Sequence, residues 1–234
     1  FIADIGIQSL GAVSVGLYPT NPASEVEYLL SHSESKILFA EDQEQVDKAL
    51  QVIENLPLLE KIVYFEDRGL YSYDHPKLMR FDEFLEIGKS EYESFPEYVD
   101  QQLEEINDED VAFLVYTSGT TGKPKGSMIT HGNISWVASQ IPNFSLVENV
   151  KAKDPQFLSY LPLCHIFGRL TDLLIASHTM ATINFAESID TVQMDLAEIQ
   201  PTIFPAVPRI LERMHSGAMV KMRDASFILS LIHI

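Results

Sequence analysis

The stretch that decides the fold is Val111–Gly126, VAFLVYTSGTTGKPKG, in which an apolar run passes directly into a loop of hydroxyl, glycine and lysine residues. Residues Val111–Tyr116 predict a buried strand, because a short continuous apolar run bounded by turn residues is typical of one. The loop that follows then lies at the carboxyl end of a strand, where open α/β sheets bind ligands. Glycine lets backbone N–H groups approach an anion, hydroxyls donate further hydrogen bonds, and lysine supplies the countercharge. The stretch therefore predicts an anion site at a sheet edge.

This loop differs from a Walker A loop. That pattern has four residues between its glycines and a Ser or Thr after the lysine, whereas two residues separate Gly119 from Gly122 and Pro124 follows Lys123. Proline also removes a backbone donor. Phosphate binding here needs a different geometry, and a flexible polar turn is the alternative that the composition alone allows.

Strands and helices alternate on both sides of this loop. The sequence predicts an α/β fold with mostly parallel sheets flanked by helices. Residues 91–110 carry nine acids and no Lys or Arg, which indicates a solvated linker or an acidic helix. Trp136 is expected in the core. Strands are predicted at 11–18, 36–40, 61–65, 156–161, 182–185 and 202–206, and helices at 43–56, 81–87, 167–177, 192–199 and 208–221.

The composition and the net charge exclude several classes of function. The 234 residues carry a net charge of −18, and residues 1–110 hold 25 acids against 7 bases, so general nucleic-acid binding is excluded. The single cysteine, Cys164, excludes an internal disulfide and a cysteine-cluster metal site. No apolar run reaches the ~18 residues that span a bilayer, and we expect a cytoplasmic location. The apolar residues at both ends, at Phe1 and at 227–234, lead us to expect an internal fragment of a longer protein.

The whole loop with both lysines resembles the phosphate loop of the adenylate-forming superfamily, which includes acyl-CoA synthetases, firefly-type luciferases and peptide-synthetase adenylation domains. Residues 159–169, SYLPLCHIFGR, and 201–211, PTIFPAVPRIL, resemble segments of long-chain fatty-acid–CoA ligases. The likeness runs from about residue 1 to 224. It implies an incomplete AMP-binding domain at 1–234, part of a large N-terminal domain, with one α/β portion at about 1–106, a second at about 107–234, and the C-terminal domain absent.

The resemblance implies an acid–thiol ligase of fatty-acid metabolism. Such an enzyme uses ATP with Mg²⁺ to convert a fatty acid to an acyl-adenylate, and then forms a thioester with coenzyme A. Lys125 would offset charge on the pyrophosphate side, while Lys123 is a weaker candidate because the family varies there. No metal ligand is predicted. The residues that would bind the β- and γ-phosphates are Thr117, Ser118, Gly119, Thr120, Thr121 and Gly122.

The same resemblance implies an acyl pocket. His165 would lie near the adenylate and the acyl carbonyl as a second catalytic residue. Cys164 is expected to be a packing residue, and His131 either caps a helix or touches the nucleotide. The residues expected to line the acyl pocket are His165, Phe167, Gly168, Val207 and Pro208.

Several family motifs are missing from the chain: Tyr-Gly-x-Thr-Glu for adenine and Mg²⁺, Thr-Gly-Asp for ribose, and the carboxyl-terminal catalytic lysine. We therefore expect the fragment alone to be inactive. Part of its sheet would have exposed edges, so we also expect it not to fold stably on its own. A fatty-acyl-AMP ligase and an acyl–carrier-protein synthetase are alternatives within the superfamily. A non-catalytic nucleotide- or partner-binding remnant is the alternative of another class. Acyl chain length, oligomeric state and peripheral membrane contact stay open.

Overall fold

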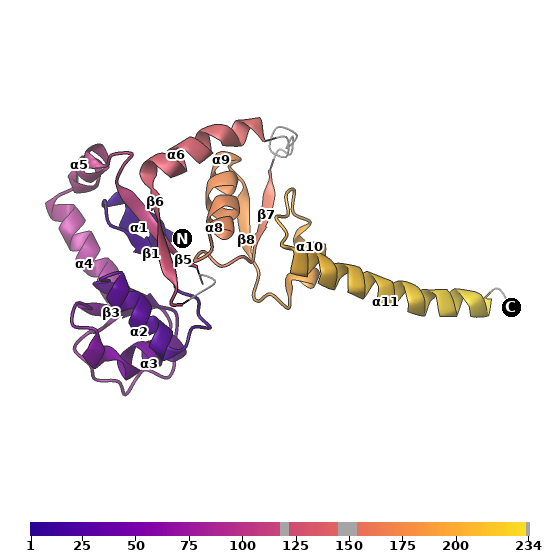
Figure 1. Ribbon diagram of the computed structural model, residues 1–234, viewed down its shortest axis with the longest axis horizontal. Helices are drawn as coiled ribbons and strands as arrows, with labels where there is room; N and C mark the ends of the chain where they lie inside the picture. The colour runs from indigo at the N-terminus through magenta and orange to yellow at the C-terminus, as the bar shows by residue number, and fades with distance from the viewer. Residues whose placement is uncertain (118–121, 145–153, 233–234) are drawn as a thin grey trace. The chain divides into compact units, whose positions relative to one another are not determined.

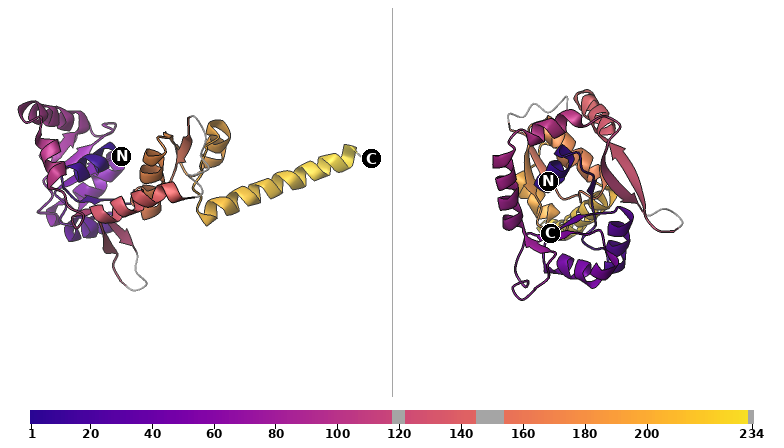
Figure 2. Two further views of the ribbon diagram at one scale, coloured as in Figure 1. Left: turned by 90° about the horizontal axis from the view of Figure 1, so that it is seen from above. Right: turned by 90° about the vertical axis from the view of Figure 1, so that its left-hand side faces the viewer.

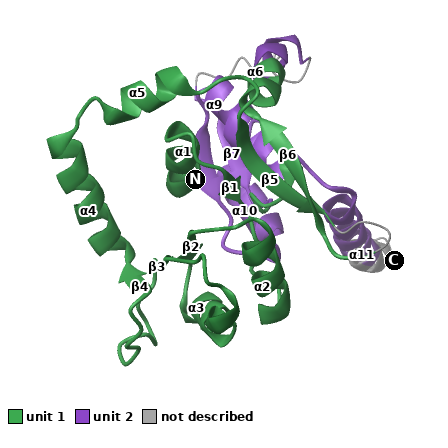
Figure 3. Cartoon of the chain, turned by 60° about the vertical axis from the view of Figure 1, so that its left-hand side comes forward, with its two compact units in different colours: residues 1–137, 162–166 green, residues 138–161, 167–234 purple. Residues whose placement is uncertain are grey.

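A computed structural model describes residues 1–117, 122–144 and 154–232 of the protein, and the account below concerns these residues (Figure 1). The chain divides into two compact units. The first comprises residues 1–137 and 162–166, and the second comprises residues 138–161 and 167–234 (Figure 3).

The first unit holds two three-stranded sheets. In one, β2 (Ile37–Ala40), β3 (Lys61–Tyr64) and β4 (Leu78–Arg80) run parallel in that order. In the other, β1 (Ser14–Val15) lies parallel to β5 (Val111–Thr117), and β6 (Lys125–Thr130) lies antiparallel to β5. The helices are α1 (Ile2–Ser9), α2 (Ala23–His32), α3 (Gln43–Gln51), a 3₁₀ turn η1 (Ile53–Asn55), α4 (Phe81–Ser94), α5 (Tyr98–Glu105) and α6 (His131–Gln140), of which residues 138–140 belong to the second unit.

The β2–β3–β4 sheet is stabilised by an apolar core shared with α2 and α3. Asp42 caps α3 by accepting the backbone N–H of Gln45 at 3.2 Å, as N-terminal aspartates commonly do. Val46 and Ala49 lie three residues apart on one side of α3, and both are buried in the core that contains Ala40 of β2 and Ile62 of β3. The core residues include Val26, Leu30, Val46, Ala49 and Ile62.

The second unit is built around a parallel pair, β7 (Gln156–Ser159) and β8 (Thr182–Phe185). The connection between them contains α8 (Ile166–Gly168), a π-helical turn η3 (Arg169–Ile175) and α9 (Ala176–His178). A 3₁₀ turn η2 (Ile141–Asn143), α10 (Val192–Ile199) and α11 (Pro208–Ile232) complete the unit. Figure 2 shows α11 as one uninterrupted helix. The buried residues of this core are Ile141, Phe157, Ile175, Ala176 and Ile203.

The predicted fold class is confirmed, since the parallel pairs and their helices form an α/β architecture. Of the two structures expected for residues 91–110, the structure shows the acidic helix. α4 ends at Ser94, α5 spans Tyr98–Glu105, and almost all residues of this stretch are exposed.

Three expectations were wrong. The strand at 202–206 reduces to one bridge between Ile203 and Phe157, because Pro201 and Pro205 have no N–H for a ladder. The strand at 11–18 reduces to Ser14–Val15, since the chain beyond it packs against the Cys164 backbone. Trp136 is 66% exposed rather than buried. Ile134 of α6 packs on β5. Trp136 lies two positions later and therefore points to another side of the helix.

Candidate functional site

The loop singled out in the sequence joins the two strands of a hairpin. The buried strand β5 ends at exposed Thr117, and β6 starts at Lys125, directly opposite Thr117. Gly122 has a φ of 107°, a conformation that a residue with a Cβ rarely adopts. The predicted phosphate-binding residues Thr117 and Gly122 therefore lie at the two sides of one hairpin end. Ser118, Gly119, Thr120 and Thr121 lie outside the described residues.

β6 was not expected, since the sequence predicted a loop through Gly126. Its first residues, Lys125 and Gly126, disfavour a strand, and only Ile129 and Thr130 at its end favour one. The strand forms through its antiparallel pairing with β5. The pairing runs from Val111 opposite Thr130 to Thr117 opposite Lys125. As a result, Lys125 emerges from a strand end rather than from a free loop.

Two lysines lie at this end of the hairpin. Lys123 Nζ lies 4.8 Å from the centroid of the Tyr28 ring, and Lys125 is exposed. Within residues 1–117, 122–144 and 154–232, neither lysine forms an ion pair with a carboxylate. Both ammonium groups are thus available to an anion, which supports the predicted phosphate-binding role without testing it.

The helix that follows β6 is capped by Thr130 and Asn133. The Thr130 N–H donates to Asn133 Oδ1 at 3.1 Å, and the Asn133 N–H donates to Thr130 Oγ1 at 3.2 Å. This reciprocal pair follows the capping-box pattern, so the cap is not His131. The His131 Nε2 atom is shielded from water and has no hydrogen-bond partner among the described residues.

His165 belongs to the first unit and is exposed. Its N–H donates to the Pro162 carbonyl at 3.0 Å in a turn. The neighbouring Cys164 is buried, which confirms its expected packing role. Burial, followed by the nearby Cys164, raises the pKa of Tyr18. The structure thus gives His165 an accessible position beside a packed segment.

The other predicted pocket residues belong to the second unit. Phe167 and Gly168 form the end of α8, and Pro208 is the first residue of α11. The Val207 N–H donates to the Tyr160 hydroxyl at 3.4 Å, and that hydroxyl donates to the Pro205 carbonyl at 2.9 Å.

Tyr160 was not singled out from the sequence, although it lies within the quoted segment 159–169. Its ring stacks on Phe204 with centroids 5.4 Å apart, and burial raises its pKa. Its hydroxyl holds the chain just before α11, where Val207 lies. The signal that could have found it is a tyrosine directly after a buried strand, since the hydroxyl of a tyrosine in such a place needs a hydrogen-bond partner.

A buried carboxylate fixes the π-helical turn to β7. Ser159 Oγ donates to Asp172 Oδ2 at 2.6 Å, and Thr171 Oγ1 donates to Asp172 Oδ1 at 2.7 Å. Asp172 is 1% exposed. Burial raises the pKa of Asp172, and the two hydroxyl donors partly offset this rise. The cluster therefore sets the course of the chain immediately after Phe167 and Gly168.

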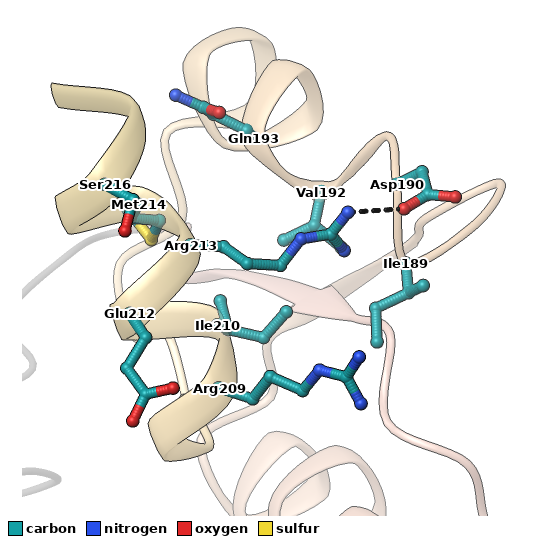
Figure 4. A pocket seen from close by; sticks show the side chains of 10 residues that line it. All are labelled: Ile189, Asp190, Val192, Gln193, Arg209, Ile210, Glu212, Arg213, Met214 and Ser216. Carbon is teal, nitrogen blue, oxygen red and sulfur yellow. Dashed lines mark hydrogen bonds and ion pairs between the residues drawn. The ribbon is translucent and has the colours of Figure 1, made fainter. Parts of the chain in front are cut away.

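A cavity of about 470 Å³ lies between the turn before α10 and the start of α11; Figure 4 shows the side chains that line it. Arg213 donates to Asp190 at 2.8 Å on its wall, and Arg209 lies nearby. No residue predicted for the site lines this cavity.

The described part of the chain contains no group of three or more His, Cys, Asp or Glu side chains placed to hold a metal ion. None of its helices combines the length and apolar character needed to cross a bilayer.

Comparisons with known proteins place this geometry in a family. The chain is 34% identical over 218 residues to the long-chain-fatty-acid–CoA ligase ACSBG2 of Xenopus laevis, covering 92% of this chain and 29% of that protein. It is 33% identical over 231 residues to long chain acyl-CoA synthetase 4 of Arabidopsis thaliana, covering 93% of this chain and 32% of that protein. The chain thus spans about a third of the length of these curated relatives.

The fold is similar to solved structures as well. The A domain of carboxylic acid reductase from Segniliparus rugosus, in complex with AMP and a carboxylic acid, matches with a TM-score of 0.65 at 20% identity, covering 95% of this chain and 37% of that one. At this identity the likeness shows the fold. The family described as AMP-binding enzyme matches residues 1–232. The chain therefore belongs to the AMP-binding enzyme family.

Proposed function

We propose that the protein that carries this chain is a long-chain fatty-acid–CoA ligase. It activates a fatty acid with ATP to an acyl-adenylate and pyrophosphate, and then transfers the acyl group to the thiol of coenzyme A with release of AMP. Family membership and the names of the relatives support this proposal. The observation that carries it is the β5–β6 hairpin, which presents Lys123 and Lys125 without carboxylate partners among the described residues.

The hairpin residues fit a triphosphate. Attack of a carboxylate on the α-phosphate brings an anion to a highly charged group, so charge stabilisation is a large part of the catalysis. Lys125 would offset charge on the leaving pyrophosphate, with Lys123 in a lesser role. Thr117 and Gly122 would supply hydroxyl and N–H donors, together with Ser118, Gly119, Thr120 and Thr121. Mg²⁺, when bound, would neutralise part of the phosphate charge.

The acyl side of the site is also a proposal. His165 would contact the adenylate and the acyl carbonyl from its exposed position in the turn after Pro162. The acyl chain would lie along Phe167, Gly168, Val207 and Pro208. We further propose that residues 1–234 are part of an AMP-binding domain with portions at about 1–106 and 107–234, and that the protein works in the cytoplasm.

The decisive experiment replaces Lys125 by Ala in the full-length protein and measures fatty-acid-dependent ATP–pyrophosphate exchange. We expect at least a tenfold slower exchange, which corresponds to about 1.4 kcal/mol of activation free energy. Lys61→Ala is a matched control, because Lys61 also begins a strand and its Nζ donates only to the Pro76 carbonyl among the described contacts. An exchange rate that Lys125→Ala leaves unchanged would refute the proposed role of Lys125.

The acceptor is tested separately. Thioester formation with coenzyme A across fatty acids of increasing length supports a long-chain CoA ligase. Release of acyl-adenylate without a thioester, or transfer to a carrier protein instead, would replace the proposal by a related ligase.

A further inference from the structure

Two side chains of α2 reach across to the hairpin that carries the lysines. Tyr28 and His32 are four residues apart on one side of α2, with ring centroids 5.4 Å apart. The Tyr28 hydroxyl donates to the Pro124 carbonyl at 2.9 Å. His32 Nδ1 and the Tyr116 hydroxyl share a hydrogen bond of 2.8 Å. The α2 helix therefore contacts the end of β5 and the residue just before β6.

The Tyr28 ring makes a second contact at the same place. Lys123 Nζ lies 4.8 Å from its centroid, within the range of a cation–π interaction. One side chain thus contacts two consecutive residues of the returning segment: the ammonium group of Lys123 through its ring and the carbonyl of Pro124 through its hydroxyl. These are the residues immediately before Lys125.

The Pro124 carbonyl lies just outside the ladder, because the described pairing of β6 with β5 begins only at Lys125. Among the described contacts, the Tyr28 hydroxyl donates to this carbonyl. Behind the same point, a Cβ on Gly126 would lie 3.2 Å from Cζ of the Tyr116 ring. Gly126 therefore sits directly on that ring, whose hydroxyl is bound by His32. The start of β6 is therefore contacted by Tyr28 at Pro124 and by Tyr116 at Gly126.

We infer that Tyr28 is a positioning residue for nucleotide binding: it fixes the segment from Lys123 to Lys125 so that both ammonium groups are in place before a nucleotide arrives. This inference rests on the proposed function. Tyr28 is 96 positions away from Pro124 in the chain, and no sequence motif connects them. Losing Tyr28 weakens ATP binding by freeing the lysines rather than by removing a contact with the ligand.

The test compares Tyr28→Phe and Tyr28→Leu in the full-length protein. Calorimetric titration with ATP and Mg²⁺ measures nucleotide affinity, and exchange kinetics give KM for ATP and for the fatty acid. Tyr28→Phe removes the bond to Pro124 and keeps the ring, so we expect about fivefold weaker ATP binding. Tyr28→Leu also removes the cation–π contact and should weaken ATP binding about twofold to fivefold more. KM for the fatty acid should stay within about twofold in both variants.

Tyr73→Phe is the matched control. The Tyr73 hydroxyl donates to Asp47 at 2.7 Å and accepts from Gln43 at 2.9 Å, so the same atom is removed at a site that does not contact the hairpin. We expect this variant to lower the melting temperature without changing ATP affinity. Unchanged ATP affinity in Tyr28→Phe and Tyr28→Leu, or an equal loss in Tyr73→Phe, would overturn the inference.

The outcome is separable from that of the proposed function. If the wild-type protein activates no carboxylic acid, the ligase proposal fails, while the affinity for ATP and Mg²⁺ still measures the effect of Tyr28. If the wild type is active and the Tyr28 variants bind ATP normally, only the inference fails.

Discussion

Removing one hydroxyl next to the buried carboxylate gives the sharpest test of how the second unit is held together. Ser159 donates to Asp172 at 2.6 Å, and both residues are buried. A hydrogen bond to a charged group contributes about 1.5–3 kcal/mol, and its loss leaves a buried carboxylate oxygen short of a donor. We therefore expect Ser159→Ala to lower the local stability of β7 and η3 by about 2 kcal/mol.

Hydrogen exchange followed by mass spectrometry measures this effect locally. A loss of about 2 kcal/mol speeds amide exchange about 30-fold wherever exchange reports the opening equilibrium. The acceleration should appear in peptides from β7 and η3. Thr179→Val is the control, because the Thr179 hydroxyl donates to the Ile175 carbonyl at 2.8 Å and not to a carboxylate. Its effect should be smaller and independent of pH.

The pH dependence of the stability loss in Ser159→Ala gives a second test of the same hydrogen bond. Burial places the pKa of Asp172 in the folded chain above the ordinary 3.8. A raised carboxyl pKa stabilises the fold most at pH values below 3.8, and this contribution is lost as the pH rises through the folded value. Without the Ser159 donor the pKa rises further, so the deficit of Ser159→Ala should grow with pH above 3.8. An exchange ratio between variant and wild type that is the same at about pH 4 and about pH 8 would refute the reasoning.

Other substitutions test the packing more simply. In Gly16→Ala the new Cβ would lie 2.6 Å from Cα of Cys164, and we expect a loss of about 3 kcal/mol in urea unfolding; a loss near zero would mean that the two segments are not in contact. Phe157 is 0% exposed, so Phe157→Ala should cost about 3–5 kcal/mol by the same assay, and a cost below about 1 kcal/mol would contradict the core described here. Asp190→Asn breaks an exposed ion pair with Arg213 at 2.8 Å, so thermal denaturation should show a change below about 1 kcal/mol.

Local patterns predicted the elements that carry their own signal. The apolar run at Val111–Tyr116 is β5, and the helix expected at 192–199 is α10 with the same bounds. The loop that we propose to bind phosphate could be singled out because its glycines, hydroxyls and lysines are contiguous in the sequence. In contrast, β6 depends on pairing with β5, and residues such as Gly126 and Ser127 do not favour a strand by themselves.

Contacts between distant residues account for the rest of the candidate site. Tyr28 reaches Pro124 across 96 positions, and Tyr160 reaches Pro205 across 45. A single sequence contains no local signal for either pair. Asp172 in η3 likewise depends on a distant partner, since its buried carboxylate accepts from Ser159 on β7, 13 residues earlier. The domain portions at about 1–106 and 107–234, and the roles of the site residues, stay predictions.

The pairing of Thr117 with Lys125 has a consequence for tolerance to insertion. Both ends of the intervening segment are anchored in one sheet, so the entropy of closing it is already spent when the chain folds. Each doubling of a closed segment costs only about 0.6 kcal/mol more. Extra residues between these anchors would therefore leave the sheet intact while displacing the proposed phosphate donors, so that an insertion at this one place would separate folding from nucleotide binding.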